Sequence, residues 1–274
     1  ALTITGDPGD AFPGPGPNAP ILDGSTLGNA IPAVTIAQGV SNVVFEGFEI
    51  RNYGTSGNTN EDGVSVWNSG TFNIRVSDNY IHHVGYDGIL VGNGWGGPQG
   101  LHSGWVIARN IIKNFGAYAI DLENAEDSLV ANNEISNPTY TTTYGIVVTS
   151  LGCGTNSIDM SNVTVSGNNI TNYPDRAMTV LAWTSAAGAT STLRDVNVVG
   201  NTITGSFNAI LAWRAGPGTN ILRDITITDN NITINNPKAA NYIVDLADAA
   251  GSNNLERNNM TLTGTIGGGG TFFH

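Results

Sequence analysis

The chain has 274 residues, of which only 12% are Asp, Glu, Lys or Arg, and its net charge is −12. So few charges exclude a charge-rich helical bundle or coiled coil, and the acidic balance disfavours nucleic acid as a partner, because that needs a basic stripe. No run of about 18 apolar residues could span a membrane. The single Cys allows neither an internal disulfide nor a cluster of thiolate metal ligands.

Residues 1–35 predict an irregular N-terminal cap or arm. They contain Asp7-Pro8-Gly9, the alternating Pro and Gly of residues 13–17, and Asp23-Gly24, all of which favour turns. The stretch Leu2-Thr3-Ile4-Thr5 is β-prone, and we expect it to reach away from the body of the molecule.

Residues 36–265 contain a repeat with a mean spacing of 30 residues. Most copies read N-x-I, preceded by a short alternating apolar run such as Val163-Thr164-Val165 and followed by a second run such as Gly145-Ile146-Val147-Val148. Alternation with a period of two indicates half-buried strands. The copies end at Ile50, Ile81, Ile112, Ile135, Ile170, Ile203, Ile232 and Met260.

A repeat of this length that consists of short strands and turns is typical of a solenoid. The sequence therefore predicts an all-β protein, a single right-handed parallel β-helix of about eight coils. An antiparallel sandwich is the alternative, but it predicts no Asn at a fixed register. We expect two inward columns, one of Ile81, Ile112, Ile135, Ile170, Ile203 and Ile232, and one of Ile89, Ile120, Ile146, Ile210 and Ile243.

The repeated Asn has a structural explanation in this fold. It falls at a tight bend between two strands, and Asn tolerates the left-handed conformation that such a bend can require. Asn amides stacked at the strand spacing can also form hydrogen bonds along the column.

Residues 266–274 predict a Gly-rich C-terminal tail that ends in Phe272, Phe273 and His274. Neither end of the repeat shows a helical cap, although the terminal coils of a solenoid expose strand edges. We therefore expect Leu2 and Ile4 at one end and Phe272 and Phe273 at the other to contact neighbouring copies, giving an open head-to-tail homo-oligomer. Cys153 could add an intersubunit disulfide, or remain a free thiol.

Two carboxylates occupy equivalent places in neighbouring repeats, in Asn60-Glu61-Asp62-Gly63 and Gly85-Tyr86-Asp87-Gly88. Stacked on adjacent coils they would repel, so one pKa would rise, as acid–base catalysis requires. The alternative is that Asp62 and Asp87 cap the turns before their strands.

This layout, over residues 60–181, resembles the polygalacturonase-like glycoside hydrolases. The resemblance implies a right-handed β-helix that acts on polysaccharide through an N-x-D-G motif, a G-D-D motif, a H-G motif and an R-x-K motif. Asp62 and Asp87 carry over from the first two. The other positions read Tyr86 for the first Asp of G-D-D, Tyr144 for the His, and Met178-Thr179-Val180 for R-x-K, with Arg176 nearby.

Two further groups could bind ligands. Trp183 and Trp213 are one mean repeat apart and could stack as a platform for sugars, although they could equally pack under a loop or in a subunit contact. Asp121, Glu123, Glu126 and Asp127 could hold Ca²⁺, but no EF-hand spacing is present and a solvated acidic turn is favoured. No other cofactor is expected.

Four N-x-S/T sequons occur, at Asn162, Asn169, Asn231 and Asn259, and they agree with a glycosylated extracellular or cell-surface protein. Because the catalytic motifs are incomplete, the sequence favours a structural protein without enzymatic activity, a subunit of a filament, sheath, surface layer or spike. The alternative is a secreted hydrolase or lyase that acts on a polysaccharide through Asp62 and Asp87.

Overall fold

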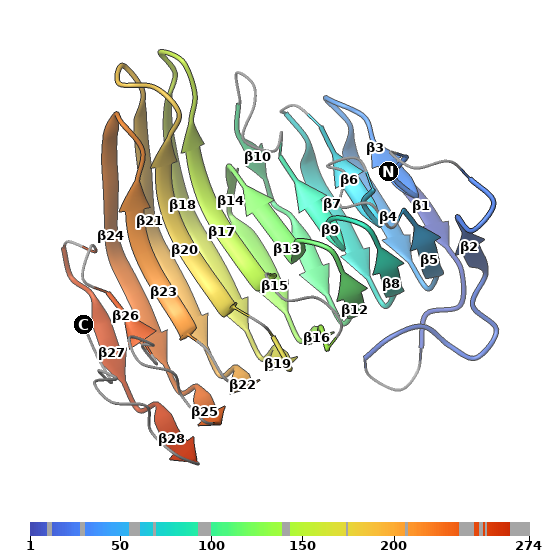
Figure 1. Cartoon of the computed structure of the whole chain (residues 1–274). Coiled ribbons are helices and arrows are strands. Elements are labelled where there is room, and N and C mark those ends of the chain that lie inside the picture. The colour runs from blue at the N-terminus through green and yellow to red at the C-terminus, as the bar shows by residue number, and fades with distance from the viewer. Residues whose placement is uncertain are drawn as a thin grey trace.

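The computed structural model shows three parallel β-sheets running along one rod (Figure 1). It describes residues 1–9, 13–27, 31–54, 61–67, 70–92, 100–138, 143–173, 175–205, 208–235, 244–246, 249 and 251–263. These residues include no helix, and so none that is long and apolar enough to cross a membrane.

The strands of the described residues divide among the three sheets as follows. The first sheet contains β1 (Leu2–Thr5), β4 (Ser41–Glu46), β7 (Phe72–Ser77), β10 (His102–Ser103), β11 (Val106–Ala108), β14 (Ala125–Glu126), β15 (Ser128–Ala131), β18 (Ser157–Ser166), β21 (Thr190–Val199), β24 (Thr219–Thr228) and β27 (Asn254–Glu256). The second contains β2 (Ile21–Asp23), β5 (Glu49–Tyr53), β8 (Tyr80–Val84), β12 (Ile111–Phe115), β16 (Glu134–Ser136), β19 (Asn169–Thr171), β22 (Thr202–Gly205), β25 (Asn231–Asn235) and β28 (Asn259–Thr263). The third contains β3 (Val34–Ile36), β6 (Val64–Val66), β9 (Ile89–Val91), β13 (Tyr118–Glu123), β17 (Tyr144–Gly152), β20 (Arg176–Thr184), β23 (Asn208–Ala215) and β26 (Val244–Asp245).

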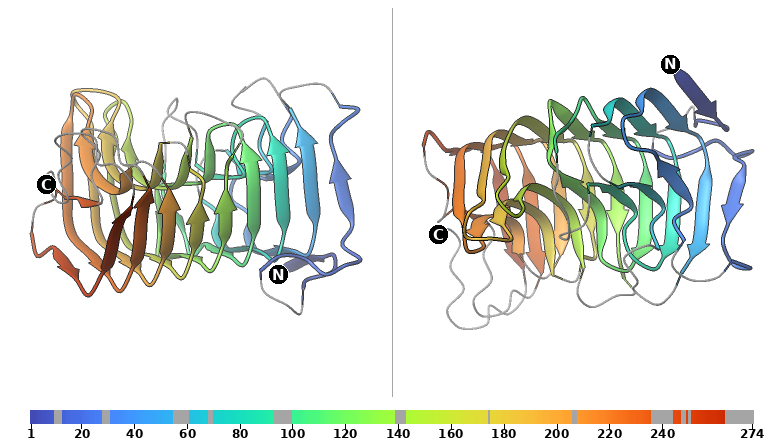
Figure 2. Two further views of the ribbon diagram at one scale, coloured as in Figure 1. Left: turned by 60° about the horizontal axis from the view of Figure 1, so that its bottom comes forward. Right: turned by 90° about the horizontal axis from the view of Figure 1, so that it is seen from above.

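Each coil passes through the first, second and third sheets in turn and then moves one strand along the rod. Strands β4, β5 and β6 form one coil, for example, and pair in parallel with β7, β8 and β9 of the next. Strands β1 and β28 consequently lie at opposite ends of the rod (Figure 2). The third sheet has eight strands in the described residues, which confirms the expected parallel β-helix of about eight coils.

The core consists of the two expected columns of apolar side chains. Each Ile of the first column lies directly opposite the next across a strand pair, and all are buried, as predicted. In the second column Met178 occupies the place between Ile146 and Ile210. The last expected member is wrong by one position, because Val244 pairs with Ile210, and Ile243 falls outside the described residues.

The Asn column forms a continuous ladder along the rod, as expected. Each Asn donates from Nδ2 to the Oδ1 of the Asn on the next coil, over distances of 2.9 to 3.1 Å. A second Nδ2 hydrogen bond goes to a main-chain oxygen of the preceding coil, as from Asn168 to Val130. The ladder consists of Asn79, Asn110, Asn133, Asn168, Asn201, Asn230 and Asn258.

The left-handed residue at the bend is not the ladder Asn itself. The positive φ falls one residue earlier, at Asp78 (59°), Asn132 (56°), Gly167 (64°) and Asp229 (58°), for example. The residue before the Asn therefore forms the bend, and its left-handed conformation directs the Asn side chain into the interior. Buried amides of this kind need all their hydrogen bonds, which explains why Asn recurs where Ser or Asp would satisfy fewer groups.

Part of the N-terminal segment that we expected to be irregular belongs to the sheets. Strand β1 pairs in parallel with β4, and β2 pairs in parallel with β5. The expectation that residues 2–5 reach away from the body is therefore wrong, because the edge of β4 offers them main-chain hydrogen bonds. Residues 266–274, with Phe272 and Phe273, lie outside the described residues.

We predict that Asn168→Ala destabilises the protein strongly. The change leaves the main-chain and side-chain N–H groups of Asn133 without their acceptor and removes both Nδ2 hydrogen bonds. Each buried group left without a partner costs about 1–3 kcal/mol, so we expect a loss of about 3 kcal/mol or more in the free energy of unfolding in urea.

The neighbouring variant Asn169→Ala is the matched control. Asn169 is exposed on the outer face of the second sheet, so its loss should change the free energy of unfolding by less than about 0.5 kcal/mol. Equal effects of the two substitutions would contradict the ladder as the stabilising feature.

Candidate functional site

Asp62 and Asp87 lie in equivalent places on neighbouring coils, two residues before Val64 and Ile89, which pair in the third sheet. Oδ1 of Asp62 accepts a hydrogen bond from the main-chain N–H of Asp87 at 3.2 Å, and Oδ1 of Asp87 accepts one from the N–H of Tyr118 at 2.9 Å. Both side chains are fully buried, and neither Oδ2 has a hydrogen-bond partner. One oxygen of each carboxyl therefore caps a turn, while the other is buried without a hydrogen-bond partner.

A third carboxyl lies close to this pair. Asp121 points outward from β13, next to the inward Ile120, and only 2% of it is exposed. The sequence favoured an acidic turn for Asp121, but in the structure Asp121 lies on strand β13 and alternates with the inward Ile120. Burial then leaves its Oδ1 without a hydrogen-bond partner.

Burial raises the pKa values of these carboxyls and so makes them weaker acids than usual. It raises the pKa of Asp62 to about 7, against the lowering effect of the hydrogen bond from Asp87, and the charge of Glu61 adds to the rise. Burial also raises the pKa of Asp87 well above its usual value, helped by the charges of Asp62 and Asp121. The pKa of Asp121 is raised by burial and by the charge of Glu123. Protons are therefore held in this cluster at neutral pH.

The four acidic residues considered for Ca²⁺ do not form one site. Asp121 and Glu123 lie on β13 of the third sheet, whereas Glu126 lies on β14 of the first sheet. Asp127 follows it with a φ of 51° and accepts a hydrogen bond from Asn162. Within the described residues, no group of three or more His, Cys, Asp or Glu is arranged to hold a metal ion.

A row of aromatic and cationic side chains extends from the carboxyls along the third sheet. Tyr118 pairs with Tyr144, and Tyr144 with Arg176, in the register that begins next to Asp87. The rings of Tyr118 and Tyr144 stack with centroids 5.3 Å apart, and the Arg176 guanidinium lies 4.9 Å from the Tyr144 centroid and 5.4 Å from that of Trp213. These side chains are partly exposed, so they form the accessible edge of the site.

The register shows where the motif positions of the resemblance lie. The coil after Asp87 contributes Tyr118, and Tyr144 belongs to the coil beyond it. Arg176, which lies outside the R-x-K position, is the cation that joins the row. Of residues 178–180, only Thr179 points outward, because Met178 and Val180 lie in the core.

Polar atoms without partners gather on this face. In the described residues, eight buried atoms with no hydrogen-bond partner lie on the outer side of the third sheet or at the start of its strands. A buried polar group normally has a partner, so such a concentration indicates a surface that a ligand completes. The atoms are Asp62 Oδ2, Ser65 Oγ, Asp87 Oδ2, Asp121 Oδ1, Thr149 Oγ1, Arg176 Nε, Thr179 Oγ1 and Trp213 Nε1.

Trp183 and Trp213 share this outer face but do not stack as expected. Trp213 pairs with Leu181, and Trp183 pairs with Ala215, so the two rings are offset by two residues along the strands. The irregular spacing of the coils causes this offset, because 30 residues is a mean and not the local repeat. Contact of either Trp with sugar remains a prediction.

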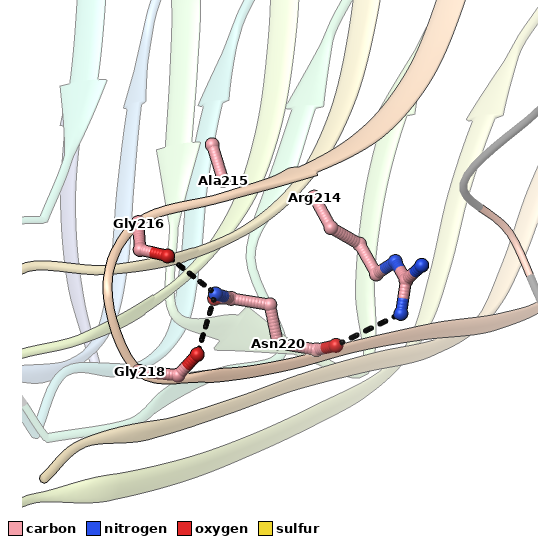
Figure 3. Close-up of a pocket in the computed structure, with 5 residues that line it drawn as sticks. All are labelled: Arg214, Ala215, Gly216, Gly218 and Asn220. Atoms are coloured by element: carbon pink, nitrogen blue, oxygen red, sulfur yellow. Dashed lines mark hydrogen bonds between the residues drawn. The ribbon is translucent and has the colours of Figure 1, made fainter. Parts of the chain in front are cut away.

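A pocket of about 320 Å³ lies at the turn between β23 and β24, away from the carboxyls (Figure 3). Nδ2 of Asn220 donates to the main-chain oxygens of Gly216 and Gly218, and Arg214 donates to the main-chain oxygen of Asn220. Arg214 thus points into the turn, opposite to its outward neighbour Trp213. Because the residues that line the pocket bond to one another, we interpret it as a feature of this turn.

The remaining residues of interest are dispersed. Asn169, Asn231 and Asn259 are exposed on the second sheet, and Asn162 lies at an exposed bend of the first, so their glycosylation remains a prediction. Cys153 is a free thiol and is only 7% exposed, which disfavours an intersubunit disulfide.

The fold is shared with solved proteins that bind or cleave polysaccharides. The tailspike protein of Escherichia coli bacteriophage HK620, solved with a hexasaccharide, has a TM-score of 0.57 and 16% identity over 87% of this chain. The endo-xylogalacturonan hydrolase from Aspergillus tubingensis has a TM-score of 0.55 and 13% identity, over 88% of this chain and 79% of its own. This chain spans 40% of the tailspike chain.

These likenesses show that the chain has the fold of the right-handed parallel β-helix proteins. No family model matches the sequence, and no curated protein matches it.

We predict that the protein loses stability as the pH rises. A carboxyl whose pKa is higher in the folded than in the unfolded chain keeps its proton on folding between the two values, so stability is greatest below the unfolded pKa of about 3.9. For Asp62 the loss continues to its folded pKa of about 7, and the raised pKa values of Asp87 and Asp121 act in the same direction. The free energy of unfolding should fall by up to about 1.4 kcal/mol per pH unit for each group.

Asp121→Asn should flatten this slope and stabilise the protein at pH 8, as measured by urea unfolding across the pH range. Asp159→Asn is the control, since the Asp159 side chain is 60% exposed. Identical pH slopes for the two variants would show that Asp121 is not the strained group that we describe.

Proposed function

We propose that the chain binds a polysaccharide along the outer face of the third sheet and hydrolyses it with Asp62 and Asp87. The carrying observation is the concentration of eight buried polar atoms without hydrogen-bond partners on this face, including one oxygen of each carboxyl. A glycan supplies many hydroxyl groups that both donate and accept hydrogen bonds, so it can satisfy such a surface.

The raised pKa values suit the two roles in glycoside hydrolysis. Asp87, whose pKa is raised well above its usual value by burial, donates its proton to the glycosidic oxygen as the bond to the anomeric carbon breaks. Asp62, as the carboxylate, forms a bond to that carbon. Asp87 then takes a proton from water, and the water oxygen displaces Asp62. Neighbouring coils are about 4.8 Å apart, a spacing that favours a nucleophile and an acid over a pair separated by water.

The partly exposed row beside the carboxyls is where we expect the glycan to make first contact. Tyr118, Tyr144 and Arg176 follow the rod axis, one per coil. Because Asp62 and Asp87 are buried, sugar binding must displace the groups that cover them before reaction, and apo geometry often changes in this way. The activity of the xylogalacturonan hydrolase and the hexasaccharide bound to the tailspike support a carbohydrate ligand.

We predict that Asp62→Asn and Asp87→Asn each lower the rate of polysaccharide cleavage by at least about 100-fold. The rate is measured as reducing ends released from a broad panel of neutral and acidic glycans, and unsaturated products are assayed in parallel to reveal a lyase. Asp159→Asn should retain wild-type activity, and urea unfolding checks that every variant folds. If the wild-type protein cleaves no glycan in the panel, the hydrolase proposal is wrong.

A second function, that of a structural subunit, is favoured by the ends of the rod. In the described residues, five of the seven exposed large apolar side chains lie in the first coil: Leu2, Ile4, Ile21, Leu27 and Ile31. Strands β1, β2 and β3 begin the same three sheets that β27, β28 and β26 end. A second copy placed head to tail would therefore continue all three sheets in parallel and cover these side chains.

We predict that the double variant Leu2→Asp, Ile21→Asp abolishes concentration-dependent self-association in sedimentation velocity. Charges at the end of the rod would have to be buried against the next copy, which is unfavourable. Ile221→Asp is the control, because Ile221 is also apolar and 36% exposed but lies on the side of the rod. Wild-type protein that remains monomeric at every concentration would contradict the structural proposal.

A further inference from the structure

The charges on the third sheet are unevenly distributed. Among the described residues of its eight strands, only Arg176 and Arg214 are cationic, and Arg214 points into the turn between β23 and β24. Among the described residues of these strands, Arg176 is therefore the cation that lies on the outer face. Against it stand the three buried carboxyls Asp62, Asp87 and Asp121.

The single cation already has partners. Its guanidinium lies over the rings of Tyr144 and Trp213, and its Nε is 3.9 Å from a carboxyl oxygen of Asp175. A sugar carboxylate would therefore compete with two aromatic faces and an acidic neighbour for this one group. Recognition of a polyanion normally requires several cations in fork-like contact with carboxylates.

The positions that could hold further cations are occupied by neutral side chains. One outward row runs from Asp121 through Val147 and Thr179 to Leu211, and it contains no cation. The parallel row includes Thr149, Leu181 and Trp213. Thr179 Oγ1 and Thr149 Oγ1 are buried without hydrogen-bond partners, so these rows offer hydroxyl groups where a uronate site would need positive charge.

We propose that the polysaccharide recognised by this face is neutral, with unsubstituted hydroxyl groups or esterified carboxyls in place of free uronates. This inference rests on the proposed function and specifies its substrate class. Hydroxyl side chains and protonated carboxyls both donate and accept hydrogen bonds, as sugar hydroxyls do. A polyanion would instead meet a chain whose net charge is −12, and like charges brought together disfavour the wrong partner.

A matched pair of glycans tests the substrate class directly. Highly methyl-esterified homogalacturonan and its saponified product have one backbone and differ only in charge. Binding of each to the wild-type chain is measured by isothermal titration calorimetry at low ionic strength, together with neutral xylan, galactan and β-glucan, and with alginate as a second polyanion. We expect at least one neutral polymer to bind about tenfold or more tightly than either polyanion.

The outcomes separate the two proposals. Polyanions that bind as tightly as the neutral polymers, or more tightly, overturn the neutral substrate class and leave polysaccharide binding intact. An absence of binding to every glycan overturns the proposed function, and the substrate class with it. Binding of neutral polymers that does not change with salt supports both.

A charge substitution gives a second, independent readout. Leu211 is partly exposed in the outward row beside Thr179, so Leu211→Lys should raise affinity for saponified homogalacturonan about fivefold at low salt. Ile221→Lys, with the same charge change on the first sheet, should not. If both variants gain affinity equally, the effect reflects net charge and the outer face of the third sheet is not the glycan site.

Discussion

The structure depends on the stacking of one side-chain amide per coil. A buried Asn must find a partner for each of its polar groups, and here the partners are the Asn of the next coil and a main-chain oxygen of the preceding coil. From Asn79 to Asn258 this requirement fixes the position of the bend in each coil, although the coils differ in length. The apolar columns beside the ladder then come into register, since Ile135, Ile170 and Ile203 each follow a ladder Asn by two residues.

That rigid register allows the opposite face to hold unfavourable groups. The third sheet keeps three carboxyls away from water, with pKa values raised by burial and by their mutual repulsion. Such a cluster opposes folding, so it persists because the ladder and the core supply enough stability to offset it. Functional sites usually consist of unfavourable groups that a rigid scaffold holds in place. The contrast between the stable ladder and the buried carboxyls therefore supports the proposed function.

The two proposed functions use different surfaces of the same rod. Glycan binding uses the side of the rod, where polar atoms lack partners, and self-assembly uses the ends, where strand edges and apolar side chains are exposed. A solenoid separates sides from ends because each coil contacts only its neighbours. One protein could therefore combine both properties, with coils added end to end extending a single continuous glycan-binding face.

The sequence by itself determined the fold, the ladder and the core columns, because each depends on a residue type that recurs in every coil. It also placed Asp62 and Asp87 in equivalent turns. It did not determine which residue carries the left-handed bend, nor that Tyr118 intervenes before Tyr144, because coils of unequal length make the mean spacing a poor guide to register. The inclusion of Asp121 and Arg176 in the site, and the offset of Trp183 from Trp213, were decided only by tertiary structure. Burial and pairing between coils are properties of the stacked rod, and no single repeat contains them.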